Sequence, residues 1–294
     1  MNPLDRVLSL SIWQGRAMVQ PLGGGMTNVN FRVQGNIAGQ RRDCVVRIGN
    51  DIGVHHVLRF NEMAASRAAH AAGVSPEVIH HEPGVLVIGY VEGRTLCAED
   101  FADPGMLDEA TALVARVHRD MPQHLRGPAM VFWVFHVIRD YAATLSAAQS
   151  RHMPLIPLLL ADAAQLEAAV GPIDMVYSHN DLLPANFLHD GRRLWLIDWD
   201  YAGFNSPLFD LGGLAANASL GTSAEVRLLT TYFGAPPDAG LWRRYRAMKA
   251  AAALREMMWS MVSEVTSDID FDYVTYTGAA ATRWHEARTA LEDC

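Results

Sequence analysis

Lysine is almost absent from this chain. Of its 24 basic residues, all but Lys249 are arginines. Any cation that the N-terminal half uses to bind an anion must therefore be an arginine, whose guanidinium is always charged and forms paired hydrogen bonds. The formal net charge of −8 argues against a general nucleic-acid-binding protein, which would need a broad basic face.

Cysteine and long hydrophobic runs are also scarce. Cys44, Cys97 and Cys294 are scattered and show neither a disulfide framework nor zinc-ligand spacing, so we expect a reducing, cytoplasmic environment. The N-terminal segment lacks the basic-then-apolar pattern of a signal peptide. Apolar runs such as residues 130–138 are too short to span a bilayer, so no membrane insertion is expected.

What is present is the composition of a globular protein large enough for two lobes. Strand patterns at 17–33, 44–48 and 84–91, with a helix pattern at 57–73, come first. Helical periodicity dominates afterwards, over 104–119, 130–149, 154–170, 222–233, 241–265 and 271–292. This order predicts an α+β protein with a small, strand-rich N-terminal lobe, 1–91, and a larger, mainly helical C-terminal lobe, 92–294.

Residues 177–210, YSHNDLLPANFLHDGRRLWLIDWDYAGFNSPLFD, contain most of the chemically informative side chains. Asp181 and Asn186 have the spacing D-x-x-x-x-N, and Asp198 ends the apolar run LWLID. The Asp-Gly pair at 190–191 predicts a hairpin that brings Asn186 close to Asp198. Phosphoryl transfer from ATP needs such a set, with one carboxylate for the acceptor hydroxyl and two oxygen ligands for Mg²⁺.

The segments HNDLLPANFL, LIDWDYAG and NSPLFDLG resemble the catalytic core of choline and ethanolamine kinases. These belong to the aminoglycoside-phosphotransferase-like group, which has the bilobal protein-kinase fold. The resemblance implies ATP and Mg²⁺ as cofactors, Asp181 as the catalytic residue, and Asn186 and Asp198 as metal ligands. It also implies that His179 and Asp210 brace the loop. The plainer alternative is that these residues only cap turns and strand ends.

The segment GGGMTNVNF at 23–31 matches the GG-M-[ST]-N segment of that family, which covers the ATP phosphates. Gly24 and Gly25 would let backbone amides approach the phosphates, and Thr27 and Asn28 would contact them through side chains. Taken alone, three glycines more often form only a flexible turn. The position between two strand patterns favours the phosphate-binding interpretation.

Arg47 occupies the strand position at which protein kinases carry their phosphate-binding lysine, and the resembling family tolerates arginine there. Glu62, on the following helix, is its expected ion-pair partner. The alternative is that both are surface residues. Tyr90 and Val91 lie in the predicted hinge, where backbone groups of the kinase fold bind the adenine edge.

The acceptor pocket is expected to come from the C-terminal helices. Glu256 and Trp259 are three residues apart, as are Tyr273 and Tyr276, so each pair shares a helical face. The resemblance implies that they line an ammonium site, since aromatic faces and carboxylates bind such cations. Asp200 is added as an acid beside the metal or the substrate. Aromatic residues at helical spacing more often belong to an ordinary helix core.

These observations predict a kinase that phosphorylates the hydroxyl of a small cationic alcohol, choline or ethanolamine, and acts as a monomer or homodimer. The alternatives are another acceptor, such as thiamine, an aminoglycoside or a sugar alcohol, or a pseudokinase that only binds nucleotide. The segment GGLAANASL lacks the acid that choline kinases can offer after this turn, which leaves the acceptor open. A protein kinase is least supported, because the segment from Asp198 to Asp210 is too short for an activation loop.

Overall fold

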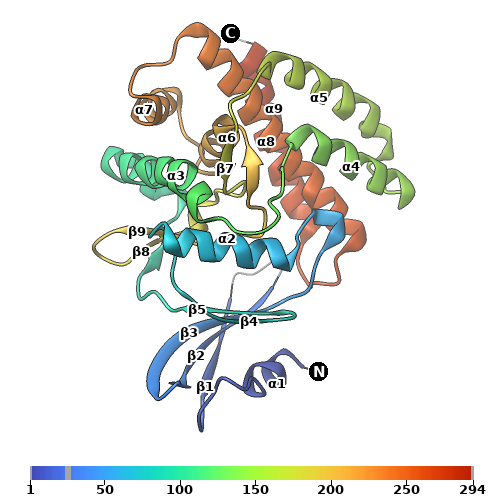
Figure 1. Cartoon of the computed structure of the whole chain (residues 1–294). Helices are drawn as coiled ribbons and strands as arrows, with labels where there is room; N and C mark the ends of the chain where they lie inside the picture. Colours follow the sequence, from blue (N-terminus) through green and yellow to red (C-terminus); the bar gives the residue numbers. More distant parts are fainter. Residues whose placement is uncertain (1, 24–27, 293–294) are drawn as a thin grey trace.

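The small lobe is a twisted antiparallel sheet. The computed structural model describes residues 2–23 and 28–292. Five strands run in the order β1-β2-β3-β5-β4, and Phe31 and Val33 alternate with more exposed residues so that they face a shared core. Helix α1 (Pro3–Leu8) packs on this sheet at the bottom of Figure 1. The strands are β1 (Met18–Leu22), β2 (Val29–Ile37), β3 (Gln40–Ile48), β4 (Val78–Glu82) and β5 (Val85–Gly89).

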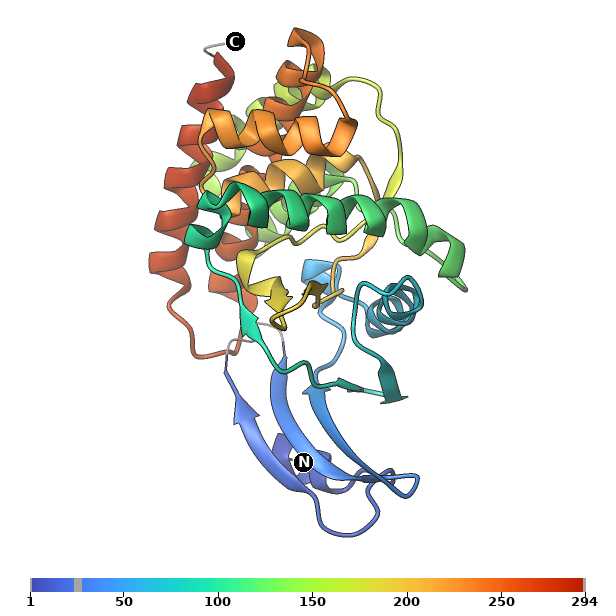
Figure 2. The same ribbon diagram turned by 90° about the vertical axis from the view of Figure 1, so that its left-hand side faces the viewer.

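Helix α2 (Arg59–Ala71) lies between the sheet and the helices of the large lobe, as Figures 1 and 2 show. It follows a short 3-10 turn, Gly53–His55, and ends where Gly73 adopts a φ of +71° that favours glycine. Its buried alanines belong to the core of the large lobe rather than to that of the sheet. The division of the chain at residue 91 therefore stays a prediction, because the packing of α2 crosses it.

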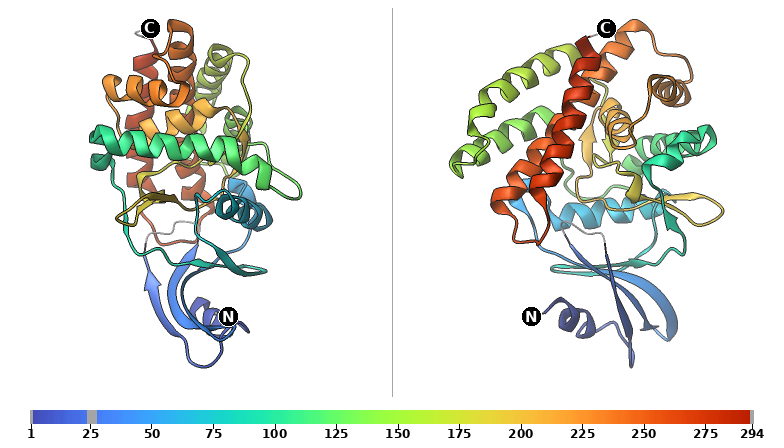
Figure 3. Two further views of the ribbon diagram at one scale, coloured as in Figure 1. Left: turned by 60° about the vertical axis from the view of Figure 1, so that its left-hand side comes forward. Right: turned by 180° about the vertical axis from the view of Figure 1, so that it is seen from behind.

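The large lobe is built around α8, a helix of 28 residues with buried side chains on most of its surface. Helices α4, α5, α6 and α9 pack against it, and Figure 3 shows α9 running alongside it. The helices are α3 (Pro104–His124), α4 (Val134–Ala147), α5 (Ile156–Val170), α6 (Pro207–Asn217), α7 (Thr222–Phe233), α8 (Ala239–Thr266) and α9 (Tyr273–Glu292). The predicted α+β class with a strand-rich small lobe and a helical large lobe is confirmed.

The segment that contains the predicted catalytic residues lies between the two lobes and includes several short strands. β8 (Phe187–His189) and β9 (Leu194–Leu196) form the predicted hairpin, whose turn includes Gly191 at a φ of +89°. β6 (Arg94–Thr95) pairs with β8, while β7 (Val176–Ser178) pairs with β10 (Gly203–Asn205). The segment that holds the predicted catalytic residues is thus tied into two small sheets.

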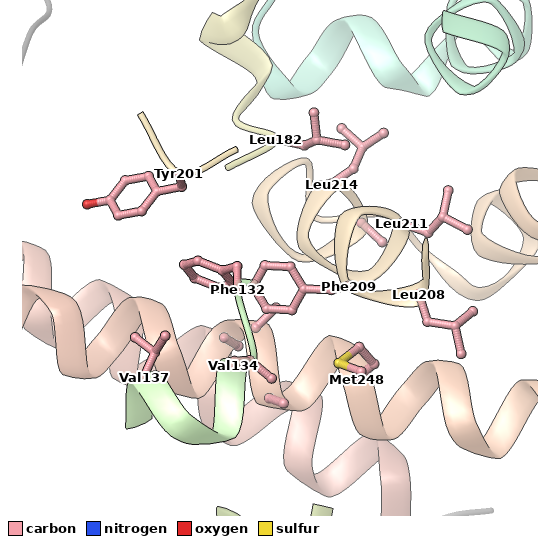
Figure 4. Close-up of a cluster of buried hydrophobic side chains, with 14 of the residues drawn as sticks. Phe132, Val134, Val137, Leu182, Tyr201, Leu208, Phe209, Leu211, Leu214 and Met248 are labelled. Atoms are coloured by element: carbon pink, nitrogen blue, oxygen red, sulfur yellow. The ribbon is translucent and has the colours of Figure 1, made fainter. Parts of the chain in front are cut away.

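Apolar neighbours anchor this segment in the core. In Figure 4, Leu182 projects toward Leu214 of α6, and Phe132 lies beside Phe209, with ring centroids 5.4 Å apart. Leu182 directly follows Asp181 in the chain and is buried. Complete burial of a leucine contributes about 1.5–3 kcal/mol. The position of Asp181 is therefore held by the core beneath it.

One segment, Met153–Val170, has the length and apolar composition of a membrane span, which the expectation of only short apolar runs missed. It comprises a 3-10 turn, Met153–Leu155, and helix α5. Its Ile156, Leu159, Ala163, Leu166 and Val170 are buried in the core of the large lobe. Packing within the protein accounts for these five residues, but only 28% of the segment is buried, and Met153, Leu155 and Leu158 are exposed.

Candidate active site

The hairpin brings the predicted metal ligands to one place. The backbone N–H of Ile197, next to Asp198, donates to the carbonyl of Asn186 over 3.0 Å. The side-chain amide of Asn186 donates to the carbonyl of Asp181 over 2.9 Å. Asp198 adopts a left-handed conformation with a φ of +69°, which is strained for a residue with a side chain. The structure therefore brings Asp181, Asn186 and Asp198 together.

Asp210 of α6 braces the loop that carries Asp181. Its carboxylate accepts hydrogen bonds from the backbone N–H groups of His179 and Asn180, over 2.8 and 2.7 Å. Burial alone would raise the pKa of Asp210, but the hydrogen bond and charge of His118 outweigh it and lower that pKa. His179 contacts the carbonyl of Ile197 over 2.9 Å. These contacts agree with the structural roles predicted for His179 and Asp210.

A pocket opens beside Asp181. It is lined by the catalytic loop, α6, α8 and α9, and its polar lining includes Asn217, Arg255, Glu256 and Arg283. Burial raises the pKa of the Asp181 carboxyl, while the charge of Arg255 lowers it. A carboxylate with a raised pKa accepts a proton more readily, which suits a general base.

On the other side of the site, Arg47 of β3 is buried among carboxylates. Its guanidinium lies 3.1 Å from Glu62 of α2 and 3.0 Å from Asp198. The ion pair predicted between Arg47 and Glu62 is therefore present. Because Arg47 also contacts Asp198, the small lobe and the catalytic segment meet at this guanidinium.

Asp200 joins the same group of charges. It is 3% exposed and lies 2.8 Å from Arg59 and 3.4 Å from Arg47, and the side-chain amide of Asn28 donates to it over 3.3 Å. These contacts place Asp200 among the cations of the nucleotide side, whereas the sequence grouped it with the substrate residues. Arg59 was missed by sequence reasoning, although its position one helical turn before Glu62 was a usable signal.

The four remaining substrate residues form one cluster. The hydroxyl of Tyr276 donates to Glu256 over 2.5 Å, and the ring of Trp259 lies 6.1 Å from the rings of Tyr273 and Tyr276. Trp259 and Tyr273 are only 4% and 6% exposed. The indole N–H of Trp259 donates to the hydroxyl of Tyr201 over 2.9 Å. The rings of Trp259 and Tyr273 therefore form the buried part of the cluster, while Glu256 and Tyr276 are less buried.

Of the predicted phosphate-covering loop, Gly24, Gly25 and Thr27 lie outside the described residues, and Asn28 is buried. In the hinge, the backbone N–H of Tyr90 donates to the carbonyl of Asp43 over 3.0 Å, so it is committed to the sheet. The Tyr90 ring packs against the guanidinium of Arg32, 3.7 Å away. Val91 is half-buried beside it. Their contact with adenine stays a prediction.

The donor chemistry at the catalytic segment fits Mg²⁺. Asn186 and Asp198 offer oxygen ligands, and the side chain of Asp198 is 33% exposed. Among the described residues, no cluster of three or more histidine, cysteine or acidic side chains is arranged to hold a metal ion. Mg²⁺ commonly takes one or two protein carboxylates and completes its shell with phosphates and water, so two protein ligands suffice.

Comparison with known proteins identifies the family. A family model described as choline/ethanolamine kinase matches residues 19–221. The chain belongs to the choline/ethanolamine kinase family. This confirms the expectation from the motifs, because the matched region includes the glycine loop, the hairpin and α6.

Named relatives of this choline/ethanolamine kinase family member match between 71% and 92% of the chain. Protein LicA of Haemophilus influenzae is 31% identical over 214 residues, which cover 71% of this chain and 61% of that protein. Probable ethanolamine kinase A of Dictyostelium discoideum is 25% identical over 302 residues, covering 92% and 85%. A solved choline/ethanolamine kinase family protein from Mesorhizobium loti has a TM-score of 0.76 at 26% identity, covering 99% and 93%.

Proposed function

We propose that this chain is an ATP- and Mg²⁺-dependent kinase that phosphorylates the hydroxyl of choline or ethanolamine. The observation that carries the proposal is the joining of Asp181, Asn186 and Asp198 next to a pocket that contains Glu256. This arrangement supports a cationic alcohol as acceptor. The cytoplasmic location and the monomeric or homodimeric state stay predictions.

In the proposed reaction, Asp181 orients the acceptor hydroxyl and accepts its proton. Such catalysis depends on positioning and charge neutralisation more than on early proton removal, because the transition state of phosphoryl transfer is loose. Asp210 holds the backbone beneath Asp181 through two hydrogen bonds. This bracing limits the rotation that would carry the carboxylate away from the hydroxyl.

Arg47 binds the phosphates from the small lobe, and Asn28 and the glycine loop cover them. Glu62 keeps the guanidinium of Arg47 in place through their ion pair. Asn186 and Asp198 would hold Mg²⁺, which neutralises phosphate charge when bound. Tyr90 and Val91 would border the adenine through backbone groups.

The acceptor's ammonium is assigned to Glu256 and Tyr276, with Trp259 and Tyr273 behind them. A carboxylate next to aromatic faces suits an ammonium group, because charge attraction and the ring quadrupole act together. Asn217 lines the same pocket on α6. A neutral amide there, in place of an acid, leaves Glu256 as the acidic group that we assign to the ammonium.

The test is ADP release with MgATP across choline, ethanolamine, thiamine, an aminoglycoside and no acceptor. We expect acceptor-dependent release with choline or ethanolamine, lost by about 10²–10⁴-fold in Asp181→Asn, since positioned general bases contribute that much. If ADP were released only with another acceptor, the pocket residues would no longer be assigned to choline or ethanolamine. No release with any acceptor, despite Mg²⁺-dependent ATP binding by the folded protein, would favour the pseudokinase alternative.

A further inference from the structure

Arg255 of α8 has no role in the reaction described so far. It stands in the stretch AAALREMMW, where a guanidinium interrupts apolar side chains, and it is 3% exposed. A charge buried this deeply in the protein needs partners, because its removal from water is costly. Its partners therefore indicate what it does.

The guanidinium stands between two carboxylates of different function. Its Nη1 atom lies 3.0 Å from Glu256 Oε2 and 3.7 Å from Asp181 Oδ1. Glu256 Oε1 accepts the hydroxyl of Tyr276. A single guanidinium nitrogen thus connects the residue that handles the acceptor hydroxyl with the residues assigned to its ammonium.

Two other donors of Arg255 lack a hydrogen-bond partner in the described part of the chain, although the buried hydroxyl of Tyr141 also interacts with the guanidinium. Within residues 2–23 and 28–292, its buried Nε and Nη2 atoms have no hydrogen-bond partner. The guanidinium instead lies over the ring of Tyr201, 4.4 Å from its centroid. Packing on this ring directs the guanidinium plane, while Nη1 makes the ionic contacts. An arginine kept for structure alone would be expected to satisfy these donors.

Arg255 balances the negative charges of Asp181 and Glu256. The catalytic loop from Asp181 to Asn186, DLLPAN, contains no cationic side chain. Arg255 supplies that charge from α8, and without it the carboxylates of Asp181 and Glu256 would repel each other at the pocket wall. Arg255 approaches the Oδ1 atom of Asp181, whose side chain is still 18% exposed and can therefore be reached by the acceptor hydroxyl.

We propose that Arg255 is a positioning residue. It holds the Asp181 carboxylate through Oδ1 so that Oδ2 meets the acceptor hydroxyl, and it links this orientation to Glu256. The inference rests on the proposed function and adds a residue to it. Since Arg255 and the acceptor ammonium both interact with Glu256, binding of the acceptor and alignment of Asp181 are coupled.

The test compares Arg255→Gln and Arg255→Lys with the wild-type chain and with Arg243→Gln, an exposed arginine on the same helix. We expect Arg255→Gln to lower kcat by about 10²-fold, the order of loss for a misplaced catalytic group, with the KM for ATP unchanged. Arg255→Lys should recover part of kcat, because it restores the charge. Arg243→Gln should leave both parameters unchanged.

A second comparison separates positioning from folding and tests the coupling. MgATP should raise the melting temperature of Arg255→Gln as much as that of the wild type, and the losses in Arg255→Gln and Glu256→Gln should not add in the double variant. Wild-type kcat in Arg255→Gln, a failure of Arg255→Lys to exceed it, or additive losses would overturn the inference. None of these three outcomes affects the proposed function as long as the wild-type chain shows turnover. If the wild type showed no turnover with any acceptor, both the proposed function and the role of Arg255 would be wrong.

Discussion

At the scale of single residues, the charged groups of the site other than Asp198 are largely buried, and they neutralise one another in groups. Arg47 contacts Glu62, Asp198 and Asp200, while Arg255 contacts Asp181 and Glu256. Removing one member of such a group leaves its partners as uncompensated buried charges. Substitutions of these residues are therefore expected to affect function more than substitutions of exposed residues nearby.

Arg47→Ala is expected to raise the KM for ATP by about 10- to 100-fold, because a charge-assisted hydrogen bond contributes about 1.5–3 kcal/mol. Initial-rate measurements at varied ATP check this. Arg41→Ala, an exposed arginine of the same strand, is the control and should not change the KM. An unchanged KM in Arg47→Ala would remove Arg47 from the nucleotide site.

His55 makes the stability of the protein depend on pH. It contacts Ser263 over 3.0 Å, and burial, with smaller contributions from Arg255 and His56, lowers its pKa to about 3. In the unfolded chain this histidine has a pKa of about 6.5, so between pH 3 and pH 6.5 the unfolded state binds more protons than the folded state. Stability from this residue is thus complete above pH 6.5 and is lost as the pH falls toward 3.

Between pH 7.5 and 5, this loss should be about 2 kcal/mol in the free energy of unfolding. Urea titrations at both pH values measure it. In His55→Gln the difference between the two values should shrink by about that amount, whereas His124→Gln, at an exposed position of α3, should retain it. An equal pH dependence in His55→Gln and the wild type would contradict the assignment.

At the scale of elements, the site depends on the close crossing of α6 and α8. A Cβ atom at Gly212 would lie 2.8 Å from the Cα and 2.9 Å from the backbone nitrogen of Lys249. Side chains can rearrange, but these backbone atoms of α8 cannot move alone. Since α6 carries Asp210 and α8 carries Arg255 and Glu256, their separation sets the geometry of the catalytic loop against the pocket.

Gly212→Ala should therefore destabilise the fold by about 1–3 kcal/mol, the usual range for overpacking. The adjacent Gly213 is a matched control, because a Cβ there would meet nothing within 4 Å. Gly213→Ala should stabilise by about 0.4–1 kcal/mol through a less flexible unfolded chain. Denaturant unfolding measures the change in stability of both variants. Equal changes in the free energy of unfolding would show that the crossing of α6 and α8 tolerates a side chain.

At the scale of the whole molecule, the lobes meet through ion pairs on the nucleotide side. Arg47 and Arg59 reach from β3 and α2 to Asp198 and Asp200 of the catalytic segment. A ligand that binds between these groups adds its affinity to the stability of the folded state. Nucleotide and metal are therefore expected to stabilise both lobes together.

MgATP at about 100 times its Kd should add about 2.7 kcal/mol to the free energy of unfolding. Chelation of Mg²⁺ by EDTA should remove most of this gain, which thermal melts with and without chelator measure. Asp198→Ala should fold but lose the dependence on Mg²⁺. If MgATP stabilised Asp198→Ala as much as the wild type, the assignment of Asp198 as a metal ligand would be wrong.

Several features follow from local sequence alone. The Asp-Gly turn between short apolar runs specified the hairpin, and with it the approach of Asn186 to Asp198. Helix periodicity located most helices within a few residues, because the 3.6-residue repeat of apolar side chains is local. In both cases, the physical cause acts over a few turns or strands of the chain. The partnership of Arg47 with Glu62 was expected from the resemblance to kinases, through the order of strand and helix, and not from a local preference.

Tertiary structure decided the rest. Asp200 pairs with Arg59, and Arg255 stands beside Asp181, because packing of distant elements chooses which buried charges meet. Residues 57–73 were recognised as a helix, but only packing showed that its buried face joins the core of the large lobe. Sequence by itself determined the elements and the catalytic motif, since those depend on local backbone preferences. The partners of buried charges depend on long-range contacts, which no local pattern encodes.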